Sequence, residues 1–170
     1  MGLWPHLTAP YSIPFEARRV IKFDPVSKST THIGPDFGEN RYKKWYTGAI
    51  TGSGIIYCLP KFYGRGILKI DTNTDTVTEL DRNLFQKMVI ICGDHVLSCA
   101  AALDGCIYCM PCHARRIIKL DPNNNYAISR VGDDLGRGLK YIGTVVGIDG
   151  CVYGIPSDSF QTYLETRSNQ

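Results

Sequence analysis

One short pattern, a tyrosine followed by two small or apolar residues and a proline, recurs along this chain. Its four copies occupy residues 11–14, 57–60, 108–111 and 153–156. Their tyrosines are 46, 51 and 45 residues apart. An apolar stretch that ends in Lys-x-Asp follows the first three copies. Repetition with a period of about 40 to 50 residues, built from short apolar runs and turn residues, is typical of β-propeller blades and related β-repeats.

The two central repeats each predict four short strands. In the first of them we expect strands at 47–51, 55–59, 67–70 and 76–80. In the second we expect strands at 98–102, 106–110, 116–120 and 126–131. Gly-Ser-Gly or Asp-Gly turns separate the first two strands of each unit and favour hairpins. No segment shows a helical pattern of useful length, so we predict an all-β fold of four-stranded antiparallel blades, with the first strand of each blade lining the central channel.

The blade count is incomplete. The chain opens on a strand of the second type at Tyr11 and closes after another at Tyr153, which gives about three and a quarter blades. We expect one repeat domain with units at about 11–46, 47–97, 98–143 and 144–160, and a tail at 157–170. Propellers usually have about four to eight blades. We therefore expect either a piece of a longer propeller or a chain whose ring is completed by a protein partner or a second copy.

Composition excludes several classes of protein. Hydrophobic residues make up 44% of the 170 residues and charged residues 21%, as in globular domains. A net charge of +3, spread over the repeats, does not favour nucleic acid as a partner. There is no apolar run of about 18 residues that would span a membrane. The chain has seven cysteines, and several of them follow the repeat, so we expect reduced thiols in an intracellular, cytoplasmic protein. We expect no cofactor.

The pattern Gly-x-Ile-Tyr-x-x-Pro, followed by Arg-x-Ile-Leu-Lys-Ile-Asp, is similar to the NHL and regucalcin-like superfamily of β-propellers. The resemblance to kelch and WD-repeat propellers is looser, because the chain lacks the Trp-Asp dipeptide and the paired glycines of those families. The resemblance to the NHL and regucalcin-like superfamily covers nearly all of residues 11–156 and implies a propeller fold with a binding surface. The metal ligands of regucalcin-like enzymes have no residue-by-residue match here, so that activity is not carried over.

The candidate site is a set of charged residues on one face of the propeller. Equivalent arginines open the third strand of three repeats, and charged residues stand on the connectors between blades. The binding candidates are Arg18, Arg65, Arg115, Asp36, Asp133, Asp134 and Lys140. One interpretation is a charged ring in which arginines bind carboxylates or phosphates of a ligand or partner. The other, which we favour, is that each arginine pairs with an acidic residue of the adjacent connector and holds the blades together.

A Cys-x-x-Cys-His sequence at 109–113 has the spacing of a c-type haem attachment site. The repeat favours a structural interpretation, because Cys109 occupies a position that holds only small residues in the other copies. Cys106 and Cys109 are three apart on a strand and are predicted to face opposite sides. Only Cys112 and His113, at the start of a loop, remain as weak metal candidates.

Two further repeat positions carry structural expectations. Lys22, like its equivalents in the next two repeats, shares a strand face with the aspartate two residues on, which predicts a salt bridge with Asp24. Trp45 and Tyr141 are equivalent and are expected to pack between blades.

No catalytic motif is present. The inner strands carry small, mostly apolar residues instead of the carboxylates that a metal in the channel would need. The sequence therefore favours a non-catalytic propeller module that serves as an interaction scaffold or as a subunit of a larger assembly. The alternatives are a propeller enzyme of the lactonase or lyase type, with its metal ligands outside this segment, and a binder of small anions through the arginine-rich face.

Overall fold

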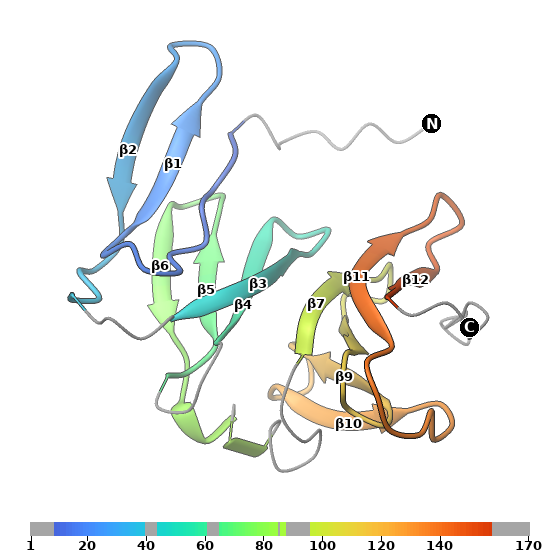
Figure 1. Cartoon of the computed structure of the whole chain (residues 1–170). Coiled ribbons are helices and arrows are strands. Elements are labelled where there is room, and N and C mark those ends of the chain that lie inside the picture. The colour runs from blue at the N-terminus through green and yellow to red at the C-terminus, as the bar shows by residue number, and fades with distance from the viewer. Residues whose placement is uncertain (1–8, 40–43, 61–64, 85, 88–95, 158–170) are drawn as a thin grey trace.

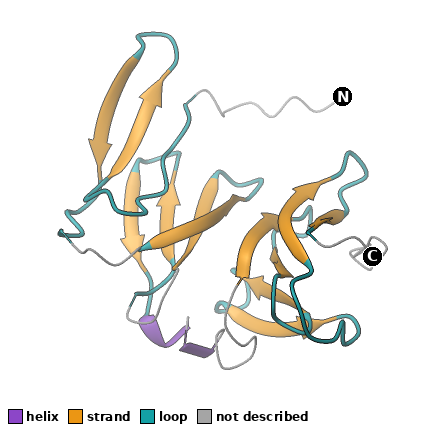
Figure 2. Ribbon diagram, in the orientation of Figure 1, coloured by secondary structure: helices purple, strands orange, loops and turns teal. Residues whose placement is uncertain are grey.

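The computed structural model describes residues 9–39, 44–60, 65–84, 86–87 and 96–157. Nearly all of its regular structure is strand, with one short helical stretch at 82–84 and 86–87 (Figure 2). This stretch follows the fourth strand of the second repeat and was not predicted. No helix in the described ranges is long and apolar enough to cross a membrane. The tail predicted at 157–170 lies, apart from its first residue, outside the described residues.

Two four-stranded antiparallel sheets form the centre of the molecule (Figure 1). Blade 2 consists of β3 (Trp45–Ile50), β4 (Ile55–Pro60), β5 (Leu68–Asp71) and β6 (Thr76–Glu79). Blade 3 consists of β7 (Val96–Ala101), β8 (Ile107–Pro111), β9 (Ile117–Asp121) and β10 (Ala127–Val131). In both blades the strands pair in chain order. The predicted strands are confirmed to within one or two residues at each end, because Gly and Asp turn residues bound them in the sequence.

The first strands of successive blades lie side by side. β3 contacts β7, and β7 contacts β11 (Tyr141–Val146), the first strand of the last blade (Figure 1). This is the propeller arrangement, with the first strand of each blade innermost and the fourth outermost. β6 accordingly shows the alternating burial of an outer strand.

The two outer blades are partial. Blade 1 contains β1 (Val20–Asp24) and β2 (Ser29–Ile33), and Tyr11 forms a bridge opposite Lys22 that marks the second-type strand. The Ser12 N–H donates to the carbonyl of Ile21 at 2.8 Å beside this bridge. Within the described residues, blade 4 contains β11 and β12 (Val152–Pro156) alone. The fold is thus a partial β-propeller of about three and a quarter blades, as the repeat predicted.

The core consists of apolar layers between successive blades. Each layer is formed by one face of a blade and the opposing face of the next. The first layer contains Val20, Phe37, Trp45, Cys58, Leu68 and Ile70. The second contains Ala49, Tyr57, Leu59, Ile67, Cys99, Ile107, Cys109, Ala114, Ile118 and Leu120. The third contains Ala100, Ala102, Cys106, Tyr108, Met110, Ile117, Tyr141 and Val152. Cys106 and Cys109 fall in different layers, so the prediction that they face opposite sides of their blade is confirmed.

Trp45 and Tyr141 are buried between blades, as expected for core aromatics. The Trp45 indole N–H donates to the Gly66 carbonyl at 2.9 Å. A side chain at position 66 would place its Cβ 1.8 Å from the Leu80 carbonyl oxygen, so this close approach requires glycine.

The predicted salt bridge of Lys22 with Asp24 is wrong. The Lys22 ammonium donates instead to Asp75 of blade 2 at 2.6 Å, and the Tyr11 hydroxyl donates to the other oxygen of the same carboxylate at 2.6 Å. Asp24 accepts the backbone N–H groups of its own turn. Short carboxylates favour such local turn hydrogen bonds, so the same-face spacing on β1 did not decide the pairing.

We expect truncation of an interblade side chain to destabilise the whole propeller. Ile70→Ala removes a fully buried side chain from the layer between blades 1 and 2, at a cost of about 2–5 kcal/mol in the free energy of unfolding. Val26→Ala, in the exposed β1–β2 turn, is the matched control and should change the free energy by less than about 0.5 kcal/mol. Urea unfolding followed by circular dichroism measures both. Equal effects would contradict the layered core.

Candidate functional site

The connector between blades 1 and 2 places Asp36 beside Arg18. The Arg18 Nε donates to Asp36 Oδ1 at 3.0 Å while a terminal nitrogen of the same guanidinium pairs with Oδ2. The Gly38 N–H donates to Asp36 Oδ1 at 2.8 Å. The Arg18 guanidinium, and to a smaller extent the Gly38 N–H, lowers the pKa of Asp36 to about 2. This is a bidentate contact, in which two N–H groups of one guanidinium donate to the two oxygens of a carboxylate, and it is among the strongest ways in which arginine binds a carboxylate.

The connector between blades 3 and 4 repeats this arrangement. The Arg115 Nε donates to Asp134 Oδ1 at 2.8 Å, and Nη2 lies 2.7 Å from Oδ2. The Gly136 N–H caps the same carboxylate at 2.9 Å. The Arg115 guanidinium is the main cause of the lowered pKa of Asp134. The same geometry in two connectors shows that the pair is a property of the repeat.

Arg65 of blade 2 departs from the pattern. Its Nη1 donates to Glu79 on the outer strand of its own blade at 3.1 Å, and its Nη2 donates to the Phe37 carbonyl at 2.8 Å. The guanidinium lies 5.4 Å from the Trp45 ring centroid, within cation–π range. Arg65 therefore ties blade 2 to the preceding connector without an acidic residue from a connector.

Two equivalent lysines are buried where their connectors end. The Lys44 ammonium donates to the Glu16 carbonyl at 3.0 Å. The Lys140 ammonium donates to the carbonyls of Gly136 and Gly138 at 3.1 and 2.9 Å. Burial lowers the pKa of both lysines. Lys140 stabilises the backbone of its own connector, and Lys44 stabilises the loop that precedes β1, because each ammonium satisfies backbone carbonyls.

The predicted site residues therefore divide into those that contact other groups of this chain and Asp133, which is described by its exposure alone. All three arginines are engaged with carboxylates, and Asp36, Asp134 and Lys140 are engaged within the connectors. Asp133 lies exposed beside Asp134. The interpretation in which the arginines pair with acidic residues describes the geometry of Arg18 and Arg115, and for Arg65 the acidic partner is Glu79 instead.

The weak metal candidates do not lie in a common environment. Cys112 is buried and His113 is exposed. Among the described residues, no group of three or more His, Cys, Asp or Glu side chains could hold a metal ion.

The partial blade count predicts two apolar blade faces without a neighbour, and one of them lies on blade 4. Large apolar side chains are exposed on and around β11 and β12, namely those of Ile142, Val145, Val146, Ile148 and Ile155. Two of them stand at repeat positions that are buried in the blades before. Val145 is equivalent to Ala49 and Ala100, and Ile155 is equivalent to Leu59 and Met110. The repeat alignment identifies the residues of this face, because it assigns these positions to the side that contacts the following blade.

The paired connector carboxylate predicts a specific acid dependence. Because the pKa of Asp36 in the folded chain, about 2, is below its ordinary value of 3.8, the pair contributes stability above pH 3.8 that is lost as the pH falls through 2. We expect Asp36→Asn to lower the urea midpoint at pH 6, and the difference from wild type to close between pH 4 and pH 2. Asp133→Asn, at the exposed neighbour, is the control and should show no such closure. A difference that stays constant with pH would contradict a role for the ionised pair.

Comparison with known proteins supports the fold and no specific activity. No protein-family model matches the sequence, and no curated protein matches it. Several solved structures are similar to this chain. An auxiliary nutrient binding protein from Bacteroides thetaiotaomicron is similar with a TM-score of 0.60 and 10% identity, over 91% of this chain and 35% of that chain. Streptogramin B lyase is similar with a TM-score of 0.57 and 13% identity, over 87% of this chain and 44% of that chain.

A quinoprotein alcohol dehydrogenase-like protein from Bacteroides thetaiotaomicron is also similar, with a TM-score of 0.54 and 14% identity over 97% of this chain and 39% of that chain. The chain thus spans less than half the length of each of these three proteins. At such low identity the likeness concerns the fold alone. The chain has the β-propeller fold, and its resemblance to NHL-type and related propellers is one of architecture.

Proposed function

We propose that this chain is a non-catalytic propeller module that binds protein through the exposed face of blade 4, and that its partner is a second copy of the chain. The observation that carries the proposal is the exposure of one repeat position. Leu59 in blade 2 is 2% exposed and Met110 in blade 3 is 1% exposed, whereas Ile155 in blade 4 is 44% exposed. In blades 2 and 3 the following blade covers this position.

Blade 1 presents the complementary face. Ile21 and Phe23 are equivalent to Leu68 and Ile70 of blade 2, which face the preceding blade and are fully buried. In blade 1 Phe23 is 37% exposed. The alternation along β1 places both side chains on the face opposite Val20, which packs on blade 2.

One chain therefore carries both halves of a blade-to-blade interface. Blade 4 offers Val145 and Ile155 on the side that contacts a following blade, and blade 1 offers Ile21 and Phe23 on the side that contacts a preceding one. Contiguous exposed apolar surface of this kind marks interaction sites. A head-to-tail contact between two copies repeats the packing already used between blades 2 and 3, and such an interface forms a ring when its rotation closes.

Two other functions have less support. Anion binding by the arginines competes with the carboxylates that Arg18 and Arg115 already hold. A lactonase- or lyase-type activity draws on the likeness to streptogramin B lyase, which at 13% identity supplies no residue-level argument.

An intracellular, cytoplasmic location is part of the same proposal. The six cysteines among the described residues are all buried. Burial raises the pKa of the Cys106 thiol to about 11, which disfavours the reactive thiolate. Buried cysteines at structural positions are consistent with a reducing compartment, where disulfides are rare.

The decisive measurement is the solution mass by light scattering after size exclusion. We expect the wild-type chain to elute as a dimer of twice 18.9 kDa, about 38 kDa. Ile155→Asp places a charge in the proposed interface and should raise the dimer dissociation constant at least tenfold, because an unpaired charge is costly to bury.

Val26→Asp is the matched control, since Val26 is also apolar and exposed but lies in a turn outside the proposed interface. It should leave the dimer intact. A wild-type mass of 18.9 kDa, or a dimer that Ile155→Asp does not weaken, would contradict the proposal.

A further inference from the structure

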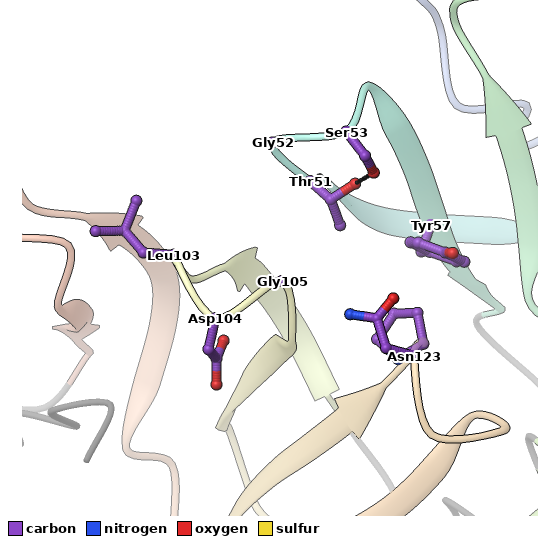
Figure 3. A pocket seen from close by; sticks show the side chains of 9 residues that line it. Thr51, Gly52, Ser53, Tyr57, Leu103, Asp104, Gly105 and Asn123 are labelled. Atoms are coloured by element: carbon purple, nitrogen blue, oxygen red, sulfur yellow. Dashed lines mark hydrogen bonds between the residues drawn. The ribbon is translucent and has the colours of Figure 1, made fainter. Parts of the chain in front are cut away.

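A cavity of about 310 Å³ opens between blades 2 and 3, among loops different from those that carry the arginines (Figure 3). Three turns and one strand line it: the β3–β4, β7–β8 and β9–β10 turns, and β4. The lining residues are Thr51, Gly52, Ser53, Tyr57, Leu103, Asp104, Gly105, Pro122 and Asn123. Its volume is at the lower end of the range for small-molecule sites, about 300–1,000 Å³.

The cavity lies at a position where the residue in blade 2 differs from those in blades 3 and 4. Ser53 stands at the position that Asp104 and Asp149 occupy in the next two blades. Each of these aspartates accepts a hydrogen bond from the tyrosine of its own blade, from Tyr108 at 2.8 Å and from Tyr153 at 2.6 Å. In blade 2 the shorter serine side chain takes the place of this carboxylate.

The tyrosine of blade 2 consequently has different surroundings. Tyr57 packs edge-on against the Tyr126 ring, with ring centroids 6.3 Å apart. The Ser53 hydroxyl instead lies 2.9 Å from the Thr51 hydroxyl, within the same turn (Figure 3). Three hydroxyl groups thus lie along one wall of the cavity without a carboxylate from their own blade.

The opposite wall supplies hydrogen-bonding capacity that the fold does not use. No hydrogen bond is made by the Asn123 carboxamide within the described ranges, whereas the equivalent Asn73 donates to Ser53 O and Asp71 Oδ1. The Asp104 carboxylate accepts the Cys106 N–H on Oδ1, and the Tyr108 hydroxyl on Oδ2. A carboxylate has about four acceptor sites, so Asp104 can take a further hydrogen bond on Oδ1.

The remaining lining is apolar. Leu103 is exposed at the rim, and Pro122 faces the cavity from the turn that carries Asn123. Asp104 is already paired with the Lys119 ammonium at 3.4 Å, which balances its charge and favours a neutral ligand over a cation. A few convergent polar groups beside an apolar wall are typical of a small-molecule site.

We propose that this cavity binds a neutral polyhydroxylated ligand of monosaccharide size. Asp104 accepts a hydrogen bond from one hydroxyl of a vicinal diol, and the Asn123 amide donates to the other. The Thr51 hydroxyl is already bonded to the Ile55 backbone and to Ser53, so Ser53 alone of this turn accepts a hydrogen bond from a further hydroxyl. Leu103 and Pro122 pack on the C–H face of the sugar ring. The inference is independent of the proposed dimer, because none of these residues lies on β11, β12 or β1.

Saturation-transfer NMR with three methyl pyranosides, of the gluco, manno and galacto series, tests the site. We expect at least one of them to show transfer in the wild-type chain, with a dissociation constant of about 1 mM. Ser53→Asp places in the turn of blade 2 the residue that blades 3 and 4 carry, so it should fold and fill the cavity. We expect it to weaken binding at least tenfold.

Asn123→Ala separates ligand binding from folding, because it removes a carboxamide that makes no hydrogen bond in the described structure. It should weaken binding at least fivefold and leave the unfolding midpoint unchanged. Asn124→Ala, in the same turn but outside the cavity lining, is the matched control and should bind as wild type does. Absence of transfer from all three sugars, or equal binding by wild type and Ser53→Asp, would overturn the inference. Neither result depends on the mass of the chain in solution.

Discussion

Apolar packing between the faces of successive blades is the interaction on which the rest of this structure depends. A four-stranded sheet with two apolar faces cannot bury both by itself, so each blade requires a neighbour on either side. The positions that face the neighbour are occupied by aliphatic residues, small residues and thiols, as with Ile70, Cys58 and Cys109. The same requirement accounts for the exposed apolar side chains of blades 1 and 4, where no further blade among the described residues covers them.

Polar groups have a secondary role that follows from this packing. Once the faces are buried, the connectors must cross from an outer strand to the next inner strand without leaving carbonyls unpaired. The buried Lys140 ammonium satisfies two of these carbonyls, and the pairs Arg18–Asp36 and Arg115–Asp134 fix the connector turns. The Lys44 ammonium binds a carbonyl of the loop before β1. The charged ring is therefore largely neutralised by its own members. The cavity proposed as a ligand site lies among other turns, where Ser53 stands at the position of the repeat's aspartate.

A repeat protein gains specific sites where one copy departs from the others. Blades 2 and 3 share their strand order and turn positions, since each packs against a neighbouring blade on both faces. At position 53 the departure removes a carboxylate that binds tyrosine in blades 3 and 4. The space is lined in part by groups with spare hydrogen-bonding capacity, such as the Asn123 carboxamide and one oxygen of Asp104. A departure of this kind is visible in the aligned sequence, but its effect depends on the turns of the neighbouring blade.

The sequence by itself determined the fold class, the strands and the inner position of each first strand, because period, apolar alternation and turn residues are local properties of the chain. It also determined that Cys106 and Cys109 lie on opposite faces, since side chains alternate along a strand. Only the tertiary structure decided the partners of charged groups. Lys22 binds Asp75 of the next blade and not the nearby Asp24, because a long side chain reaches across an interface that spacing along one strand cannot describe. The cavity beside Ser53 has the same origin, since three separate turns must come together before any of them lines a site.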